Sequence, residues 1–230
     1  MRLPTSAAVA AVLLLLVGVK LLDRTQPTSV HAVVHLAAAV AILGVARSSG
    51  LSWESVGLGR GSFRRGFAYA VPVVVVVAVA YVVLLAFPWS RGMLLDERFR
   101  QPLSQALVAA LVLVPLRTVI FEEVAFRGVL WGLVQRVRGP VWATAVSSML
   151  FGAWHVVSAL SFAGSTGLVG ERGSAESGVV ATTVVFTAAA GVLLCELRRR
   201  SGSLIPAVAL HWSVNGLGIV AVAMAWSLNR

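Results

Sequence analysis

Two adjacent glutamates and an arginine interrupt the apolar stretch VIFEEVAFRGVL, residues 119–130. A carboxylate can act as a general base toward water, whereas an arginine commonly pairs with a carboxylate. On a helix, Arg127 lies about 40° from Glu123 but about 140° from Glu122, because each residue advances by about 100°. The i,i+4 spacing therefore predicts a Glu123–Arg127 ion pair and leaves Glu122 without a local counter-ion.

Two histidines and an asparagine lie in other apolar stretches of the second half of the chain. FGAWH ends at His155, and in HWSVN Asn215 follows His211 by one helical turn. Either histidine alone could simply bond a neighbouring helix, and the glutamates with the arginine could form a purely structural cluster. If the three helices converge, Glu122 and the histidines could instead position a water, polarise a carbonyl and stabilise an oxyanion.

The composition indicates that these groups belong to a membrane protein. Of 230 residues, 58% are hydrophobic and 12% are charged, whereas soluble domains are about half apolar and about a quarter charged. The net charge of +10 comes from basic residues in short clusters between apolar runs. That pattern is typical of membrane topology and of contact with lipid headgroups, and it disfavours nucleic acid as a partner.

Apolar runs of about 20 residues, enough to cross a bilayer, predict an all-α polytopic membrane protein. Helices are expected because a lone strand in lipid would leave its backbone groups unpaired. The first run is interpreted as a membrane helix, not a signal peptide, since no clear cleavage site follows it. About seven transmembrane helices are predicted, at approximately 6–22, 30–46, 67–88, 103–122 or longer, 141–161, 178–196 and 204–226.

The fourth of these helices is expected to continue through AFRGVLWGLVQRV as one long tilted helix, with a kink at Pro115. That continuity would bring Glu122 close to the depth of His155 and His211. Lys and Arg are more numerous on the N-terminal side of the predicted topology. The positive-inside rule then predicts a multi-pass protein of the cell membrane with a cytoplasmic N-terminus.

The segments EEVAFRG, FGAWH and HWSVN resemble the three motifs of the CPBP intramembrane proteases, the CAAX-protease and bacteriocin-processing family, also called Abi. The run GVLLCELRRRSGSLIPAVALHWSVN is similar to the family's approach to its last motif. The resemblance predicts a catalytic membrane core at 104–226, a bundle of the C-terminal four helices, after a variable N-terminal region at 1–103. It implies an intramembrane endopeptidase that hydrolyses peptide bonds of membrane-associated peptides or proteins.

The resemblance also implies a role for each motif residue. Glu122 would be the general base and would activate water together with His155. His211 and Asn215 would form the oxyanion hole for the tetrahedral intermediate.

The same resemblance gives supporting positions to Glu123 and Arg127, which would hold their helix in place. Zinc is an open alternative, because Glu122, His155 and His211 form a sound ligand set for a metalloprotease. The sequence has no His-Glu-x-x-His motif, however, and the three ligands come from three helices. We therefore favour a glutamate mechanism without a cofactor.

Two other function classes suit a small polytopic protein. A non-catalytic immunity or chaperone-like membrane module would be expected to lack at least one motif residue, and all are present. A small proton-coupled transporter that uses Glu122 as a relay would show paired repeats with broken helices, and none is evident. Both alternatives are thus disfavoured by the sequence.

Three further polar residues lie outside the proposed catalytic group. His31 and His35 are one helical turn apart in HAVVH, a spacing that can chelate a metal, but no carboxylate is expected near them. We assign them to a structural or interfacial position. Arg117 projects away from both glutamates, toward either a lipid headgroup or an access route.

Overall fold

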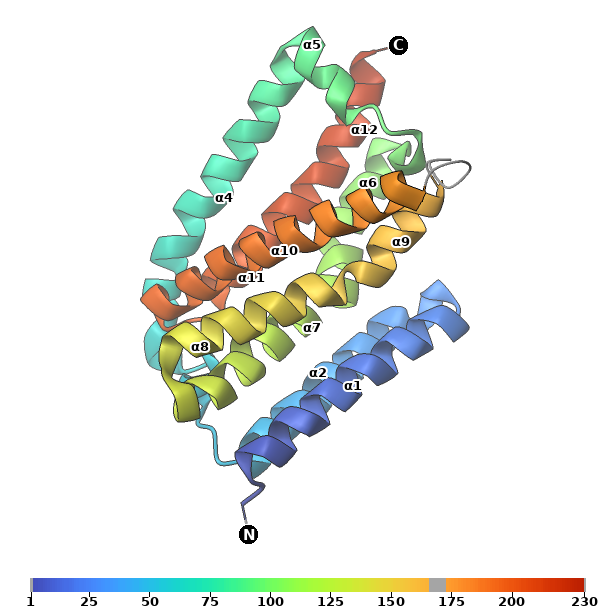
Figure 1. Ribbon diagram of the computed structural model, residues 1–230. Coiled ribbons are helices and arrows are strands. Elements are labelled where there is room, and N and C mark those ends of the chain that lie inside the picture. The colour runs from blue at the N-terminus through green and yellow to red at the C-terminus, as the bar shows by residue number, and fades with distance from the viewer. Residues whose placement is uncertain (1, 166–172, 230) are drawn as a thin grey trace.

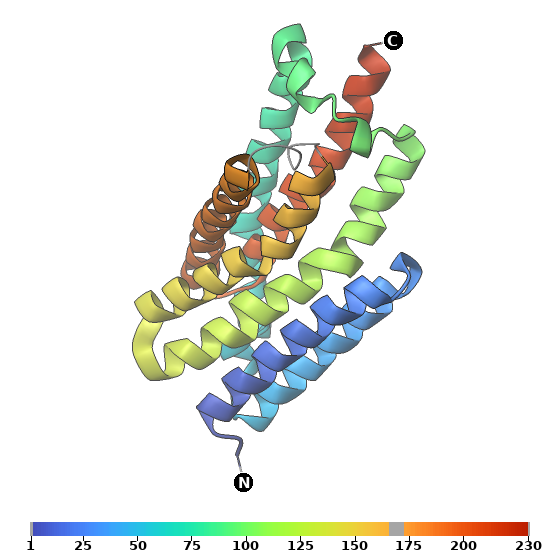
Figure 2. The ribbon, with the colours of Figure 1, turned by 45° about the vertical axis from the view of Figure 1, so that its right-hand side comes forward.

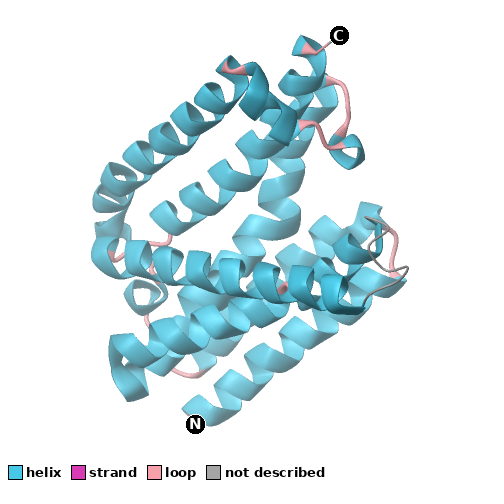
Figure 3. Cartoon of the chain, turned by 45° about the horizontal axis from the view of Figure 1, so that its top comes forward, coloured by secondary structure: helices cyan, strands magenta, loops and turns pink. Residues whose placement is uncertain are grey.

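A computed structural model describes residues 2–165 and 173–229 of the chain (Figure 1). Every regular element in these two ranges is a helix, and Figure 3 shows the helices joined by short connections. Six segments of the described chain are long and apolar enough to cross a membrane. The predicted all-α polytopic fold is therefore confirmed, and the chain is an integral membrane protein.

The helices differ widely in length. The principal ones are α1 (Thr5–Thr25), α2 (His31–Ser48), α4 (Phe63–Ala86), α8 (Trp131–Trp154), α9 (Val156–Ser165), α10 (Gly173–Ser201), α11 (Ile205–Trp212) and α12 (Gly218–Leu228). Short helical turns lie in the connections: η1 (Thr28–Val30), α3 (Trp53–Val56), η2 (Arg60–Ser62), α5 (Pro88–Arg91), η3 (Gly92–Leu94) and η4 (Glu97–Phe99). A π-helical turn, η8 (Ser213–Leu217), joins α11 to α12 as one span.

The glutamates lie in one long helix, as predicted. This helix runs through α6 (Leu103–Val108), η5 (Ala109–Leu113), η6 (Pro115–Val119), α7 (Ile120–Glu123) and η7 (Val124–Leu130) into the start of α8. Its η segments are π-helical, and one of them begins at Pro115, whose ring nitrogen cannot donate a hydrogen bond. The glutamates are thus flanked by π-helical turns, a common feature of functional sites.

The chain reverses direction inside α8, at Gly139. Its backbone angles, φ 81° and ψ 176°, are open to glycine but not to residues with a side chain, and Pro140 follows. The helix returns as a second arm, 140–154, so that 103–161 is one apolar segment with two antiparallel arms (Figure 2). This reversal explains why six segments were found where about seven helices were predicted.

The helices pack through small residues where they approach most closely. The hairpin of α1 and α2 lies against α7 and η7, α8 packs along α10, and α11 packs against α4. At the α8–α10 contact, a Cβ on Gly152 would lie 2.8 Å from the carbonyl oxygen of Val184. A Cβ on Gly191 would lie 3.0 Å from the Cα of Ser148. Glycine therefore permits the close approach of these membrane helices.

The outer surface of the bundle is apolar. On α4, the exposed residues Val71, Val75, Val79 and Val82 recur at helical spacing and form a stripe on the outside of the protein. Three charged side chains in the middle of the long helix, Glu122, Glu123 and Arg127, are instead buried. This inside-out distribution is the one that a hydrocarbon surrounding demands.

Candidate active site

The predicted ion pair forms at the centre of the bundle. Arg127 Nη1 donates a hydrogen bond to Glu123 Oε1 at 3.1 Å, and both side chains are fully buried. The guanidinium also lies over the ring of Phe151, 3.8 Å from its centroid, where a desolvated cation–π contact is favourable. Arg127 thereby connects the glutamate helix to the second arm of α8, which follows the reversal at Gly139.

Glu123 has a second partner from the last membrane span. His211 Nδ1 lies 2.8 Å from the same carboxylate oxygen, Oε1. Since a carboxylate oxygen can only accept, the proton of this bond is on Nδ1 of the histidine. Glu123 thus orients His211 and leaves its other ring nitrogen, Nε2, available to the site.

Glu122 points in another direction and has different surroundings. Its Oε1 accepts a hydrogen bond of 2.8 Å from the indole Nε1 of Trp154. Its Oε2 is buried and has no hydrogen-bond partner among the described residues. The nearest ring nitrogen is Nε2 of His211, 4.0 Å from Oε2. A single water beside this pair, at hydrogen-bond distance from each atom, would bond to both.

His155 borders this centre without a direct bond to it. The residue lies at the break between α8 and α9, and its Nδ1 donates to the carbonyl oxygen of Phe151 at 2.8 Å. The Phe151 ring packs edge-on against His155, with centroids 4.6 Å apart, and against His211, with centroids 5.9 Å apart. The phenylalanine of this motif therefore packs against both histidines.

Asn215 lies one turn beyond His211, in the π-helical turn η8. Its side chain is half-buried and makes no hydrogen bond to any described residue. The turn itself is anchored on both sides: Trp212 Nε1 donates to the carbonyl of Ala110 at 2.8 Å, and Tyr81 donates to the carbonyl of Val214 at 2.8 Å. Asn215 is thus a free polar group on a fixed backbone.

The structure thus brings four of the six predicted residues into one cluster, which consists of Glu122, Glu123, Arg127 and His211. Among the proposed zinc ligands only Glu122 and His211 approach each other, at 4.0 Å. Within the described ranges, no group of three His, Cys, Asp or Glu side chains is close enough to hold a metal ion. The arrangement does not fit a three-ligand zinc site.

The expectation that no carboxylate lies near His31 and His35 was wrong. Asp23, at the end of α1, is 3.0 Å from His35 Nε2 and 3.9 Å from His31 Nδ1. His35 Nδ1 bonds to the backbone carbonyl of Arg117, so the histidine joins α1, α2 and the glutamate helix. This contact depends on a helix hairpin, which residue spacing alone does not reveal.

Trp154 is the residue of the site that sequence reasoning did not assign. Its indole was considered either a cavity wall or a packing group, but it donates directly to Glu122. The one signal in the sequence was its position beside a motif histidine. Behind the ring, Lys20 of α1 places its Nζ 3.8 Å from the ring centroid.

The structure is thus an all-helical membrane bundle with a buried cluster of glutamates and a histidine from distant helices. Residues 104–217 match the family model described as Type II CAAX prenyl endopeptidase Rce1-like. The chain therefore belongs, through these residues, to the CPBP family, and is in general terms a CAAX-type intramembrane protease. Comparisons with curated proteins and with solved structures gave no match.

Proposed function

We propose that this protein hydrolyses peptide bonds of membrane-associated substrates with a water activated by Glu122, without a metal. The observation that carries the proposal is the pair of atoms Glu122 Oε2 and His211 Nε2, buried and 4.0 Å apart, with no bonded partner on the carboxylate oxygen among the described residues. A buried carboxylate with one free oxygen is a suitable base for a water that bonds to both atoms. Its other oxygen is held by Trp154.

The reaction would proceed by general base catalysis. Glu122 takes a proton from the water while the water oxygen bonds to the scissile carbonyl carbon. The negative charge on the carbonyl oxygen is stabilised by donors from His211 Nε2–H and the Asn215 amide, a contribution of about 3–4 kcal/mol per donor in other enzymes. Glu122 then gives its proton to the amide nitrogen as the C–N bond breaks, which leaves a carboxylic acid and an amine.

The remaining motif residues would position these groups. Glu123 accepts from His211 Nδ1 and would balance the charge of the ring when both nitrogens carry protons. Because Nδ1 of His155 already donates to Phe151, its Nε2 is the acceptor in the neutral ring. We propose that this nitrogen accepts a hydrogen bond from the attacking water or from the substrate amide.

A wholly apolar groove offers a route for a membrane-embedded substrate. It has a volume of about 580 Å³, lies between α4 and α11, and reaches Ile120 and Val124, the residues that flank the glutamates. Trp212, the neighbour of His211, forms part of its wall. An extended apolar peptide in this groove would lie beside the helix that carries the glutamates.

The test is cleavage of a membrane-peptide library by the purified protein in nanodiscs, comparing wild type with Glu122→Gln. This substitution keeps the shape and the hydrogen bond from Trp154 but removes the base. We expect a rate loss of about 100-fold to 10,000-fold, the usual contribution of a general base. Glu97→Gln is the matched control, because Glu97 is exposed and pairs with Arg100. Cleavage by Glu122→Gln at the wild-type rate would overturn the proposal.

The same assay tests the role of metal. Activity is expected to persist after treatment with a zinc chelator and to gain nothing from added zinc. Loss of wild-type activity with the chelator and recovery with zinc would replace this mechanism by a metalloprotease. If no peptide of the library is cleaved, a non-catalytic role becomes the better explanation.

A further inference from the structure

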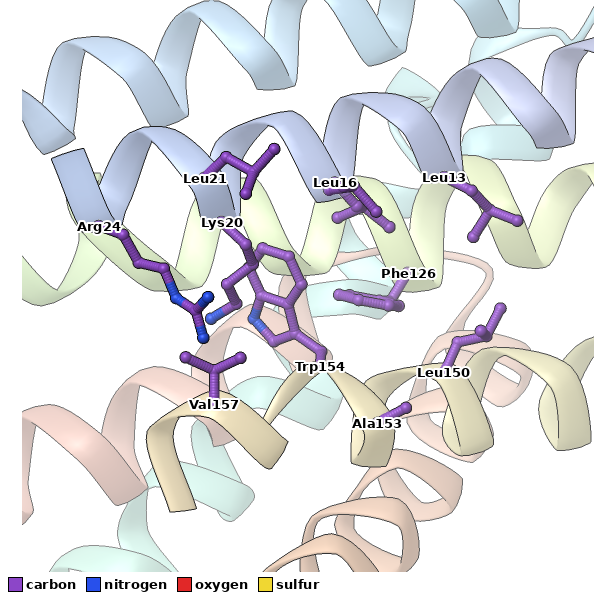
Figure 4. A pocket seen from close by; sticks show the side chains of 11 residues that line it. Leu13, Leu16, Lys20, Leu21, Arg24, Phe126, Leu150, Ala153, Trp154 and Val157 are labelled. Atoms are coloured by element: carbon purple, nitrogen blue, oxygen red, sulfur yellow. The ribbon is translucent and has the colours of Figure 1, made fainter. Parts of the chain in front are cut away.

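A second groove, distinct from the substrate groove, lies between α1 on one side and α8 and α9 on the other. It has a volume of about 470 Å³. Figure 4 shows its lining side chains: apolar residues of α1 face Phe126 and Leu150 along most of its length. The apolar part is therefore wide enough for a hydrocarbon chain, and Trp154 lies at its centre.

One end of this groove is positively charged. Lys20 and Arg24, one turn apart on α1, both line it, and Figure 4 shows their side chains together at the end opposite Leu13. Lys20 is the single lysine of the sequence. The groove thus changes from apolar to cationic along its length.

Neither cation has a carboxylate within ion-pair distance among the described residues. Asp23, which lies between them in the sequence, pairs instead with His35 on α2. Lys20 is half-buried, and its Nζ lies over the Trp154 ring, 3.8 Å from the centroid. Lys20 interacts electrostatically with Glu122 and with Asp23. The indole of Trp154 donates a hydrogen bond to Glu122. Neither cation forms a direct ion pair with a described residue, so both can bind an anion that enters the groove.

We propose that this groove binds an anionic phospholipid, with the phosphate at Lys20 and Arg24 and one acyl chain along the apolar part. Arg24 is in the last turn of α1, which ends at Thr25, so the cations lie at the headgroup level and the apolar residues deeper. Basic pockets between membrane helices bind anionic lipid headgroups. With the cytoplasmic N-terminus predicted from the sequence, the headgroup would lie in the outer leaflet.

The substrate groove between α4 and α11 can be compared with the groove of Lys20 and Arg24 in the same protein. It is larger and lined by apolar side chains alone, so it can accept a chain but cannot select a headgroup charge. Selection between phosphatidylglycerol and phosphatidylcholine is therefore expected only in the groove of Lys20 and Arg24. This prediction concerns binding and does not depend on the proposed hydrolysis.

The first experiment measures the phospholipid that stays bound to the purified full-length protein after delipidation and incubation with phosphatidylglycerol or phosphatidylcholine, by native mass spectrometry. Wild type is expected to retain phosphatidylglycerol selectively. The double variant Lys20→Gln/Arg24→Gln should lose that selectivity by about tenfold, since each cation near a lipid surface contributes a significant electrostatic attraction. Arg64→Gln/Arg65→Gln removes the same charge from exposed positions outside the groove and should retain it. Equal retention by all three proteins would overturn the proposal.

A second experiment uses the wild-type protein and so does not depend on how the variant folds. Phosphatidylglycerol with a photoreactive acyl chain is cross-linked to the protein in nanodiscs, and the modified peptides are mapped. Cross-links are expected on α1 and on the arm of α8 that carries Leu150. The proposal fails if they fall mainly on α4 and α11, or if photoreactive phosphatidylcholine gives the same map with the same yield.

Discussion

The indole Nε1 of Trp154 donates a hydrogen bond of 2.8 Å to Oε1 of Glu122, across 32 residues of sequence. This bond occupies one oxygen of the carboxylate and directs the other toward His211. Because Trp154 also packs against Phe121 and Phe126, its ring is held from two sides. The orientation of Glu122 is therefore set by a tryptophan on another helix.

Trp154→Phe should lower kcat more than it changes KM. The substitution keeps an aromatic ring against Phe126 but removes the donor to Glu122. Hydrogen bonds to charged groups contribute about 1.5–3 kcal/mol, so kcat is expected to fall by about 10-fold to 100-fold. Steady-state kinetics on a cleaved peptide provide the measurement.

Trp212→Phe is the control for this prediction. Its indole donates to the backbone carbonyl of Ala110 and not to either glutamate. A smaller effect on kcat is expected. If the two variants lose kcat equally, the bond from Trp154 has no special role in orienting Glu122.

Breaking the Glu123–Arg127 pair should destabilise the protein strongly. Glu123→Gln leaves the fully buried guanidinium without its carboxylate, and the loss of one partner of a buried pair costs about 3–5 kcal/mol. We expect a lower temperature of thermal unfolding in detergent. Glu97→Gln, which breaks an exposed pair with Arg100, should change stability by about 1 kcal/mol or less.

Replacing both members of the buried pair gives a sharper result. Glu123→Gln/Arg127→Met removes the uncompensated charge, so part of the lost stability should return. Activity should not return, because His211 loses the carboxylate that orients it. Recovery of activity with stability would contradict the positioning role of Glu123.

Asn215→Ala should reduce activity with little loss of stability. Its side chain makes no hydrogen bond to the described residues, so the folded protein loses little. Removal of an oxyanion donor typically lowers kcat by about 100-fold to 1,000-fold. The measurements are kcat and the temperature of thermal unfolding, made on the same preparations. A loss of stability large enough to account for the loss of kcat would mean that Asn215 is structural.

Gly152→Val should separate α8 from α10. The added Cβ would lie 2.8 Å from the carbonyl oxygen of Val184 and 3.0 Å from the Cβ of Ala188. Overpacking of this kind costs about 1–3 kcal/mol, and a shift of α8 would also move His155. Gly44→Val, where a Cβ meets no atom within 4 Å, is the control in a thermal unfolding assay. Equal stability of both variants would show that the helices are not limited by this contact.

The sequence was most informative where both residues of a contact lie on the same helix. The Glu123–Arg127 pair follows from i,i+4 spacing, and the long helix follows from an apolar run that continues past Pro115 and the glutamates. Buried charges in such a run also pointed to the site, because lipid cannot hold them without a function or a partner. The resemblance then indicated the family, which the family model confirmed over 104–217.

Relationships between distant helices could not be predicted in the same way. The bond of Trp154 to Glu122 and the contact of Asp23 with His35 depend on how helices pack, and a tryptophan or aspartate there has no distinctive spacing. Hydropathy did separate the predicted helices at 103–122 or longer and at 141–161, but it did not place the reversal at Gly139. Packing, and not local pattern, determines these features.

The contact between His211 and Glu123 spans 88 residues of the chain, and this has a consequence for biogenesis. Glu123 and Arg127 can pair as soon as their helix enters the membrane, so the nascent protein need not expose a lone buried charge. The partner on α11 is synthesised only with the last span. A growing chain therefore has no complete catalytic centre, and on the proposed mechanism it cannot cleave neighbouring proteins before its own synthesis is finished.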